Sequence, residues 1–303
     1  MADITTKQIR NIVLLGHGGS GKTSVCEAAL FLTKATDRLG KITDGNTVCD
    51  YDPEEIKRGF SLTLTMAPVL WKDTKINFID TPGFLDFQGE VDAGIRVADA
   101  GIIVLDGKAG VEVGAELAWD KTTDAGIPKA FFINKSDDPD AHFDKVFEQL
   151  HEQFGAAVCP VLVPYKDGKN VYFLNLIERK AYSFDAKGSR TASDFDAKME
   201  EIASQYTDTL SEALASTSEE LLDKYFEEGE ISQEESVEAL HQGIIDGSIV
   251  PVFSGSAVNL WGITFLLDTI ADSFPRPTAK KVEKIIDGDG YKDIAIDPDG
   301  EPA

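Results

Sequence analysis

The sequence is poor in the residues that build metal centres and disulfide frameworks. Its 303 residues include three cysteines and four histidines, and Cys26, Cys49 and Cys159 show no metal-binding spacing. We expect them to be the reduced, buried thiols of a cytosolic protein. The N-terminal MADITTKQIR has no apolar signal region, and no run of about 18 apolar residues could span a bilayer. These absences predict a cytoplasmic protein with no membrane segment.

Basic residues are also scarce. Lys and Arg number 29 against 53 Asp and Glu, which gives a formal net charge of −24. A protein that wraps nucleic acid needs clustered Lys and Arg to displace counterions, so such wrapping is excluded and any contact with nucleic acid should be local. Hydrophobic residues make up 42% of the chain, enough for the core of one large domain or of a domain with an insertion.

What the sequence does contain is a phosphate-binding motif. Residues 10–29, RNIVLLGHGGSGKTSVCEAA, lead from an apolar strand through a glycine-rich turn into a helix, and Gly16, Gly21, Lys22 and Thr23 fit G-x-x-x-x-G-K-[ST]. Such glycines let backbone N–H groups wrap a polyphosphate, while Lys22 supplies a charge for the β and γ oxygens and Thr23 a hydroxyl for Mg²⁺. A glycine-rich turn with a chance lysine is the weaker alternative. The loop alone does not identify the nucleotide.

Apolar strands alternate with helical segments after this loop, which predicts a doubly wound α/β fold with a mostly parallel sheet covered on both faces. The expected segments are a helix over 23–33, a long mobile loop without regular structure over 34–60, strands over 61–70, 75–79, 101–105, 130–133 and 249–253, and helices from about 141 and over 263–274.

The strand 75–79 ends in the motif DTPG at residues 80–83. A carboxylate at Asp80 can hold Mg²⁺ through water, and the absence of a side chain at Gly83 lets its N–H reach a γ-phosphate. The same four residues could form an ordinary turn, because Pro and Gly favour turns. The phosphate loop upstream favours the functional interpretation.

The strand 130–133 runs into Asn134-Lys135-Ser136-Asp137. A carboxylate at Asp137 can accept hydrogen bonds from both N1–H and the N2 amine of guanine, a donor pair that adenine lacks, while Asn134 and the Lys135 stem hold the ring. A polar strand end that caps the next helix is the alternative, which the phosphate loop disfavours. After the strand 249–253 comes SGSA, where the Ala257 N–H is the expected donor to guanine O6.

These four motifs in this order make a GTPase core, and the sequence resembles the GTP-binding domain of elongation factor G, the ribosomal translocase. It is still more similar to the elongation-factor-G-like relatives. The resemblance extends over almost the whole chain. It is carried by GHGGSGKTS (16–24), Arg58-Gly59, DTPGFLDFQGEV (80–91), VLDGKAGVE (104–112), INKSD (133–137) and PVFSGSAVNLWGITFLLDTIADSFPRP (251–277).

The resemblance also implies a domain organisation. The P-loop NTPase core would comprise residues 1–157 and 249–279, an inserted α+β subdomain would comprise 158–248, and 280–303 would be a linker to a missing downstream β-barrel domain. Within the insertion the pattern predicts strands over 161–164 and 171–175, a long helix over 197–226, and a further helix that starts at a capping box of Ser232 and Glu235. Its many acidic residues form either a partner surface or a solvated helix face.

The resemblance implies binding of GTP or GDP with Mg²⁺, and contact with the ribosome through the full-length protein, this fragment being a monomer. The implied GTP-binding residues are His17, Gly18, Gly19, Ser20, Gly21, Lys22, Thr23, Ser24, Asp80, Gly83, Asn134, Lys135, Asp137, Ser256 and Ala257. The implied Mg²⁺ residues are Thr23, Ser61 and Asp80, and the implied catalytic residues are Lys22 and Gly83.

Three departures from the family pattern bear on activity. Gly19 replaces an aspartate of the phosphate loop, and Ser61 replaces the threonine of the family's R-G-I-T, which reads R-G-F-S here. Phe84 stands where the family has the histidine that positions the attacking water. Two functions therefore stay open, a GTPase and a GTP-dependent switch with little or no hydrolysis. A P-loop kinase or ATPase is disfavoured by NKSD and SGSA together.

Recognition of the base gives a first prediction. In an Asp137→Asn variant an amide donor would face a guanine donor, so GDP affinity should fall sharply and xanthine nucleotides should be favoured. A competition titration against labelled GDP measures both effects. Binding of ATP as tight as that of GTP by the wild-type chain would show that Asp137 does not read the base.

Overall fold

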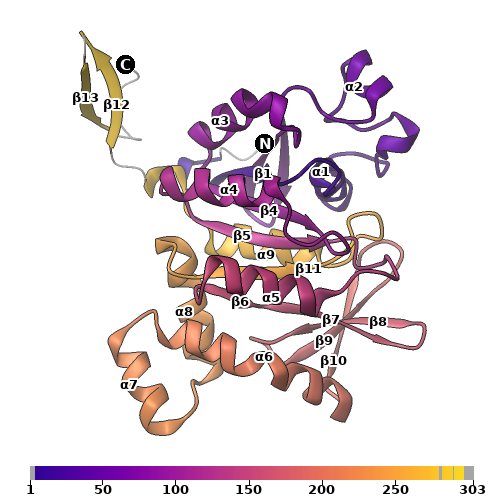
Figure 1. Cartoon of the computed structure of the whole chain (residues 1–303), viewed down its shortest axis with the longest axis vertical. Coiled ribbons are helices and arrows are strands. Elements are labelled where there is room, and N and C mark those ends of the chain that lie inside the picture. Colours follow the sequence, from indigo (N-terminus) through magenta and orange to yellow (C-terminus); the bar gives the residue numbers. More distant parts are fainter. Residues whose placement is uncertain (1–3, 280–281, 289, 297–303) are drawn as a thin grey trace.

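The computed structural model describes residues 4–279, 282–288 and 290–296, and its body is built around one seven-stranded sheet (Figure 1). The strand order is β2-β3-β1-β4-β5-β11-β6, and β2 alone is antiparallel to its neighbour. The expected mostly parallel sheet is therefore confirmed. The strands are β1 (Ile9–Leu15), β2 (Thr65–Trp71), β3 (Thr74–Asp80), β4 (Ala100–Asp106), β5 (Lys129–Asn134), β6 (Val158–Pro160) and β11 (Val250–Ser254).

Helices cover the sheet on both faces, which explains why β4, β5 and β11 are almost continuously apolar. The chain goes from β1 to β3 on one side and then back across β1 to β4. Because such crossovers are right-handed, this reversal puts α1 and α3 on opposite faces and opens a crevice at the carboxyl ends of β1 and β4. The covering helices are α1 (Lys22–Leu32), α3 (Gln88–Val97), α4 (Val113–Asp124), α5 (Phe143–Phe154) and α9 (Ile263–Ser273).

Segment 34–60 is more ordered than the sequence pattern indicates. It contains a 3₁₀ turn at Ile42–Asp44 and a short helix, α2 (Pro53–Arg58). The Asp52 side chain accepts a hydrogen bond from Glu54 N at 2.7 Å, and the Glu55 carboxylate reaches back to Asp52 N. The expectation of a loop without regular structure is wrong for α2, because its helix signals are local: an N-cap aspartate, a proline at the first position and a capping box.

The inserted region contains a second sheet and three helices. The four strands are antiparallel in the order β10-β9-β8-β7, and α6 packs beside them against β6 and β7. The elements are β7 (Leu162–Asp167), β8 (Asn170–Asn175), β9 (Lys180–Phe184), β10 (Arg190–Asp194), α6 (Ala197–Ala215), α7 (Glu219–Glu228) and α8 (Gln233–Asp246).

Two expectations for the insertion need correction. The single helix expected over 197–226 is interrupted, because Ser218 takes an extended conformation and its hydroxyl caps α7 by accepting from Leu221 N. The boundary expected at residue 158 falls inside the main sheet, where β6 pairs in parallel with β11. The capping box of Ser232 and Glu235 at the start of α8 is confirmed.

The final residues were expected to form a linker without core pattern. Instead, β12 (Val282–Asp287) and β13 (Gly290–Ala295) pair as an antiparallel hairpin that projects from the body (Figure 1). Its side chains are largely exposed, and the Arg96 guanidinium of α3 lies 2.7 Å from the Glu283 carboxylate. Residues 280–281, 289 and 297–303 lie outside the described part of the chain.

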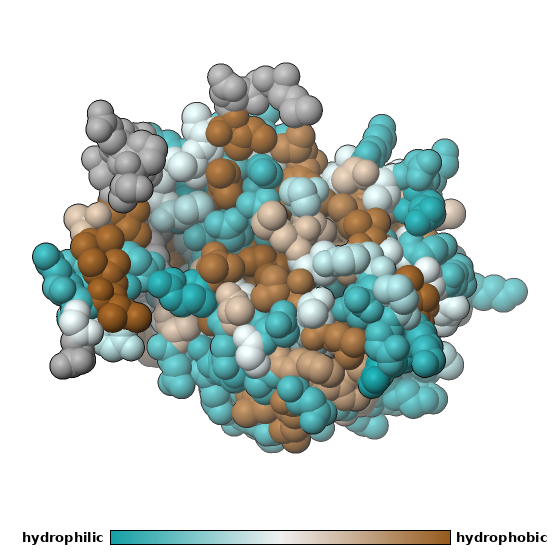
Figure 2. Space-filling view, turned by 90° about the horizontal axis from the view of Figure 1, so that it is seen from above, coloured by the Kyte–Doolittle hydropathy of each residue, from teal (hydrophilic) through white to brown (hydrophobic). Residues whose placement is uncertain are grey.

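The surface is mixed in character. Apolar side chains are scattered among hydrophilic ones on the face shown in Figure 2. Throughout the part of the chain that the structure describes, no helix combines the length and the apolar character that a membrane span requires.

Candidate functional site

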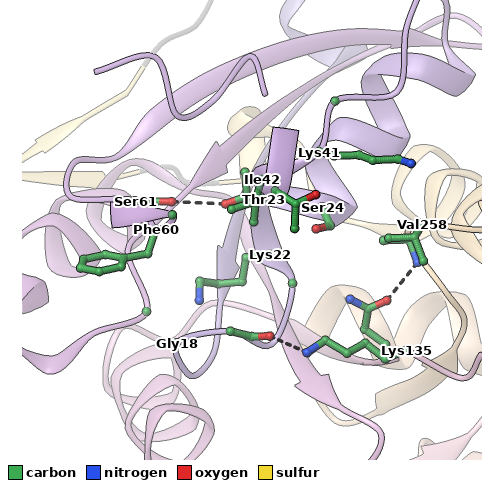
Figure 3. A pocket seen from close by; sticks show the side chains of 18 of the residues that line it. Gly18, Lys22, Thr23, Ser24, Lys41, Ile42, Phe60, Ser61, Lys135 and Val258 are labelled. Atoms are coloured by element: carbon green, nitrogen blue, oxygen red, sulfur yellow. Dashed lines mark hydrogen bonds between the residues drawn. The ribbon is translucent and has the colours of Figure 1, made fainter. Parts of the chain in front are cut away.

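A cavity of about 310 Å³ lies at the carboxyl ends of the central strands, beside the N-terminus of α1 (Figure 3). Because the N-terminal N–H groups of a helix attract negative charge, this is a favourable place for an anion. The lining combines five separate parts of the chain: the phosphate loop, segment 34–60 with Ser61, the DTPG turn, the loop that follows β5 and the loop that follows β11. The lining residues are 18–19, 21–24, 39–43, 59–61, Thr81, Gly83, Phe84, Asn134, Lys135, Ala257 and Val258.

The phosphate loop is surrounded so closely that it has no room for side chains at two of its glycines. A Cβ at Gly16 would lie 2.3 Å from the Val104 carbonyl oxygen of β4, and one at Gly21 would lie 2.3 Å from Asn134 Nδ2. Gly21 also has a φ of 98°, in the left-handed region that favours glycine. The glycines of the motif are thus required by packing as well as by access for a phosphate.

Lys22, the first residue of α1, is buried with 5% of its surface exposed. Its Nζ donates to the carbonyl oxygens of Gly16 at 3.1 Å and His17 at 2.9 Å, and in Figure 3 the side chain lies along the phosphate loop. Burial lowers the pKa of Lys22 to about 8, against the opposing influence of Asp80 and Asp50. Because desolvation destabilises its charge, an anion bound beside Lys22 would raise this pKa again.

Four oxygen-bearing side chains, those of Thr23, Ser61, Asp50 and Asp80, lie near the start of α1. The Thr23 and Ser61 hydroxyls are 3.2 Å apart, and Ser61 Oγ donates to the Asp50 carboxylate at 2.7 Å. Asp80 at the end of β3 is fully buried, neither of its carboxylate oxygens has a hydrogen-bond partner, and burial raises its pKa to about 7. Hydroxyl and carboxylate oxygens are the ligands that Mg²⁺ prefers, so Thr23, Ser61 and Asp80 fit this ion.

Asp50 is a residue of this site that the sequence analysis missed. It belongs to a cluster of acids within segment 34–60, 11 positions before Ser61, and its side chain is buried. Burial raises the pKa of Asp50, while the hydrogen bond from Ser61 opposes that shift. No spacing in the sequence links residues 50 and 61, because the intervening helix α2 determines that they meet.

The opposite end of the cavity is organised by Asn134. Its Nδ2 donates to the Ser20 carbonyl of the phosphate loop at 3.0 Å, and its Oδ1 accepts from Ala257 N at 3.0 Å. Lys135 Nζ donates to the Gly19 carbonyl at 2.8 Å and to Asp106 at 2.6 Å. The Ala257 N–H expected to face guanine O6 is therefore bonded to Asn134 here.

The expected residues are not all in the cavity wall. Eleven of the expected residues line it directly, namely Gly18, Gly19, Gly21, Lys22, Thr23, Ser24, Ser61, Gly83, Asn134, Lys135 and Ala257. Asp137 is exposed beyond the wall, and Ser20, Asp80 and Ser256 are buried behind it. The His17 ring lies outside the wall as well, with Nε2 3.6 Å from the Glu112 carboxylate.

The DTPG turn packs against the phosphate loop. A Cβ at Gly83 would lie 2.4 Å from Lys22 Nζ and 2.7 Å from Gly18 N. The Phe84 side chain covers Gly18, whose Cβ would be 3.3 Å from that ring, and its ring centroid is 4.5 Å from that of Phe60. Phe84 is 42% exposed, so the ring forms part of the outer rim of the cavity.

The close contact of Gly83 with the phosphate loop predicts that alanine at position 83 destabilises the chain, whereas alanine at position 89 does not. Gly83→Ala should lower the free energy of unfolding by about 1–3 kcal/mol, the usual effect of overpacking. Gly89→Ala is the matched control, because Gly89 is an exposed position of α3 where a Cβ would meet nothing within 4 Å. It should stabilise the helix by up to about 1 kcal/mol. Equal urea-unfolding midpoints for the two variants would contradict the close contact at Gly83.

Known proteins share this arrangement. Residues 7–276 match the family model of the elongation factor Tu GTP binding domain. Elongation factor G 1 of Syntrophomonas wolfei subsp. wolfei is 33% identical over 300 residues, which cover 98% of this chain and 45% of that protein. A crystal structure of a protein from Thermus thermophilus matches with a TM-score of 0.83 at 30% identity, over 91% of this chain and 41% of that one.

The chain therefore spans less than half the length of the relatives it matches. The family match includes the phosphate loop, the DTPG turn, NKSD and SGSA, so the resemblance to the GTP-binding domain of elongation factor G is confirmed, as is the α/β fold. From the extent of these matches we conclude that the chain belongs to the translation-factor GTPases, in the family of the elongation factor Tu GTP binding domain.

Proposed function

We propose that the chain is the GTP-binding domain of an elongation-factor-G-like protein, which hydrolyses GTP to GDP and phosphate slowly by itself and faster on the ribosome. Lys22 at the N-terminus of α1, buried among backbone carbonyls, is the observation that supports this most directly. We further propose that the domain works in the cytoplasm as a monomer without membrane contact, and reaches the ribosome through the complete protein.

Lys22 and the phosphate-loop N–H groups would bind the polyphosphate. A desolvated ammonium gains more from a bound anion than an exposed one does, because its present hydrogen bonds go to neutral carbonyls and the nearby Asp80 and Asp50 do not offset its desolvation. Thr23 and Ser61 would hold Mg²⁺ directly and Asp80 through water, with Asp50 positioning the Ser61 hydroxyl. When bound, the ion would neutralise charge on the β and γ oxygens. The Gly83 N–H, next to Gly18, would donate to the γ-phosphate once the turn moves outward.

Asp137, Asn134 and Lys135 would recognise guanine. The exposed Asp137 carboxylate is free to accept from a ligand that provides two donors on one edge, and guanine provides such a pair. Asn134 already joins the phosphate loop to the SGSA loop, so it would keep the two ends of the nucleotide site in fixed relation. Lys135 lies across Gly19 and would extend its stem along the base.

In this proposal, Phe84 is the reason why the chain hydrolyses GTP slowly in the absence of the ribosome. A phenyl ring can neither donate nor accept the hydrogen bond that orients an attacking water, and here it packs on Phe60 at the rim. An activating partner could still order residues 83–88, which begin at the last residue of the DTPG turn, around a trapped water. The alternative is a GTP-dependent switch with little or no hydrolysis, for which the same ring is the supporting observation.

The role of Lys22 can be tested with two buried lysines of the same chain. Lys22→Ala should weaken GDP binding by about 10- to 100-fold, since it removes hydrogen bonds from a charged donor. Lys129→Ala is the control. Lys129 is also buried, but its Nζ lies 4.3 Å from the Trp119 ring centroid, and the residue is outside the cavity wall. Isothermal titration with GDP, together with melting temperatures, separates affinity from stability. Unchanged affinity in Lys22→Ala would exclude this loop as the phosphate site.

The role of Phe84 can be tested by restoring the family residue. Phe84→His should raise ribosome-stimulated single-turnover GTP cleavage by the complete protein, by up to about 10²-fold if the imidazole orients water. GTP affinity should stay the same, because the ring lies at the rim. Leu85→His places an imidazole one position further along at a similarly exposed site and should have no effect. Rapid hydrolysis by the isolated wild-type chain would show that another residue orients the water.

A further inference from the structure

Two of the three cysteines lie against each other next to the nucleotide site. Cys26 is on α1, three residues after Thr23, and Cys49 is in segment 34–60. Their sulfur atoms are 3.4 Å apart, and both side chains are almost completely buried. A disulfide holds its sulfurs about 2.05 Å apart, so an approach of about 1.4 Å would join them.

The surrounding hydrogen bonds place Cys49 where segment 34–60 is attached to α1. The buried Glu27 carboxylate, next to Cys26, accepts from Val48 N at 2.5 Å and from Cys49 N at 3.3 Å. The Cys49 carbonyl in turn accepts from Thr65 Oγ1 at 3.0 Å. A covalent bond between Cys26 and Cys49 would therefore keep the segment in the position it already occupies.

This attachment point is connected to the cavity wall on both sides. Asp50, directly after Cys49, accepts from Ser61 Oγ, and Ser61 lines the cavity with residues 59–60. Before Cys49, residues 39–43 of the same segment line the cavity as well. Gly40 contacts Glu27 so closely that a Cβ there would lie 2.2 Å from its Oε2. Movement of the segment away from α1 would thus open the nucleotide site.

We propose that Cys26 and Cys49 are an oxidative modification site, at which hydrogen peroxide forms an intramolecular disulfide that ties segment 34–60 to α1. The consequence rests on the proposed function: the disulfide slows the opening of the cavity and therefore the release of guanine nucleotide.

One molecule of hydrogen peroxide is enough to oxidise the two thiols to a disulfide. When the segment separates from α1, the Cys49 sulfur attacks the O–O bond, and water leaves as a sulfenic acid forms. When the segment returns, the Cys26 sulfur displaces the hydroxyl as a second water, and the S–S bond forms. Two thiols are oxidised, and the peroxide is reduced to two waters. Burial in the closed position shields both thiols, so the reaction depends on the opening of this segment.

Cys159 provides a control within the same chain. It lies on β6 and is completely buried, and its pKa is raised, as are those of Cys26 and Cys49, so the geometry and not the pKa distinguishes the proposed pair. The two partners of the proposed disulfide are on α1 and in segment 34–60, so Cys159→Ser should react as the wild type does. Cys49→Ala removes one partner while keeping a small apolar side chain in place.

The first test measures the bond itself. The reduced chain is treated with hydrogen peroxide, unfolded, alkylated and mapped by mass spectrometry. Wild type should lose two of its three thiols, with a linked peptide pair that contains Cys26 and Cys49 and is restored by dithiothreitol. Cys49→Ala should form no disulfide. Peptides in which both cysteines are alkylated, or in which either is linked to Cys159 or to a second molecule, would overturn the proposal.

The second test measures the consequence with fluorescent N-methylanthraniloyl-GDP. Peroxide treatment should slow release of this nucleotide by about tenfold in wild type and in Cys159→Ser, but not in Cys49→Ala, since a cross-link disfavours the open state. Equal release rates with the disulfide present would overturn the regulatory part. A chain that binds no guanine nucleotide would overturn the proposed function and the regulatory part with it, while the mapping experiment still decides whether the bond forms.

Discussion

Close contact between backbone segments around the phosphate loop is the constraint on which the site depends. Val104 O of β4 occupies the space of a side chain at Gly16, and the His17 backbone does the same at Gly114, where α4 begins. The Asn134 side chain occupies the space that a side chain at Gly21 would need. Because these contacts come from β4, the end of β5 and α4, neighbouring elements hold the shape of the loop together with the hydrogen bonds that Lys22 donates to the Gly16 and His17 carbonyls. A side chain at any of these glycines would separate elements that the nucleotide site needs together.

Around this rigid loop the buried charges remain incompletely paired. Lys22 faces neutral carbonyls, Asp80 has no hydrogen-bond partner, and Glu27 uses one of its two carboxylate oxygens. Each buried charge that lacks a partner is costly, and the pKa of Lys22 is lowered while those of Asp80 and Glu27 are raised by burial. A bound polyphosphate with a divalent cation supplies partners of both signs. The destabilised charges are thus the physical reason for the high affinity that we expect of the site.

Local patterns predicted six of the seven strands of the main sheet and the phosphate loop, because each is determined by residues close in sequence, but they did not predict β6. The sequence did not predict the hydrogen bond between Asp50 and Ser61, the contact between Cys26 and Cys49, or the position of Gly83 against Gly18. These contacts depend on how segment 34–60 and the DTPG turn fold back onto α1. The break at Ser218 was missed because the apolar pattern continues on both sides of its local cap signal. The terminal hairpin was missed because its exposed strands have no core pattern.

Phe60 and Phe84 both differ from the family pattern, and their rings pack against each other. Where the family reads R-G-I-T this chain has Phe60 before Ser61, and where the family has a histidine it has Phe84. The two rings are 4.5 Å apart at 54°, although the residues belong to segments far apart in the sequence. Such a pair contributes about 0.5–1.5 kcal/mol beyond its area burial, so each ring favours the presence of the other. The phenylalanine at position 84 therefore does more than remove a polar group: it joins the segment that carries Ser61 to the turn that carries Gly83 by an apolar contact over Gly18. In the function proposed above, this packing would couple the segment that carries Ser61 to the DTPG turn at the position where the family resemblance implies a histidine.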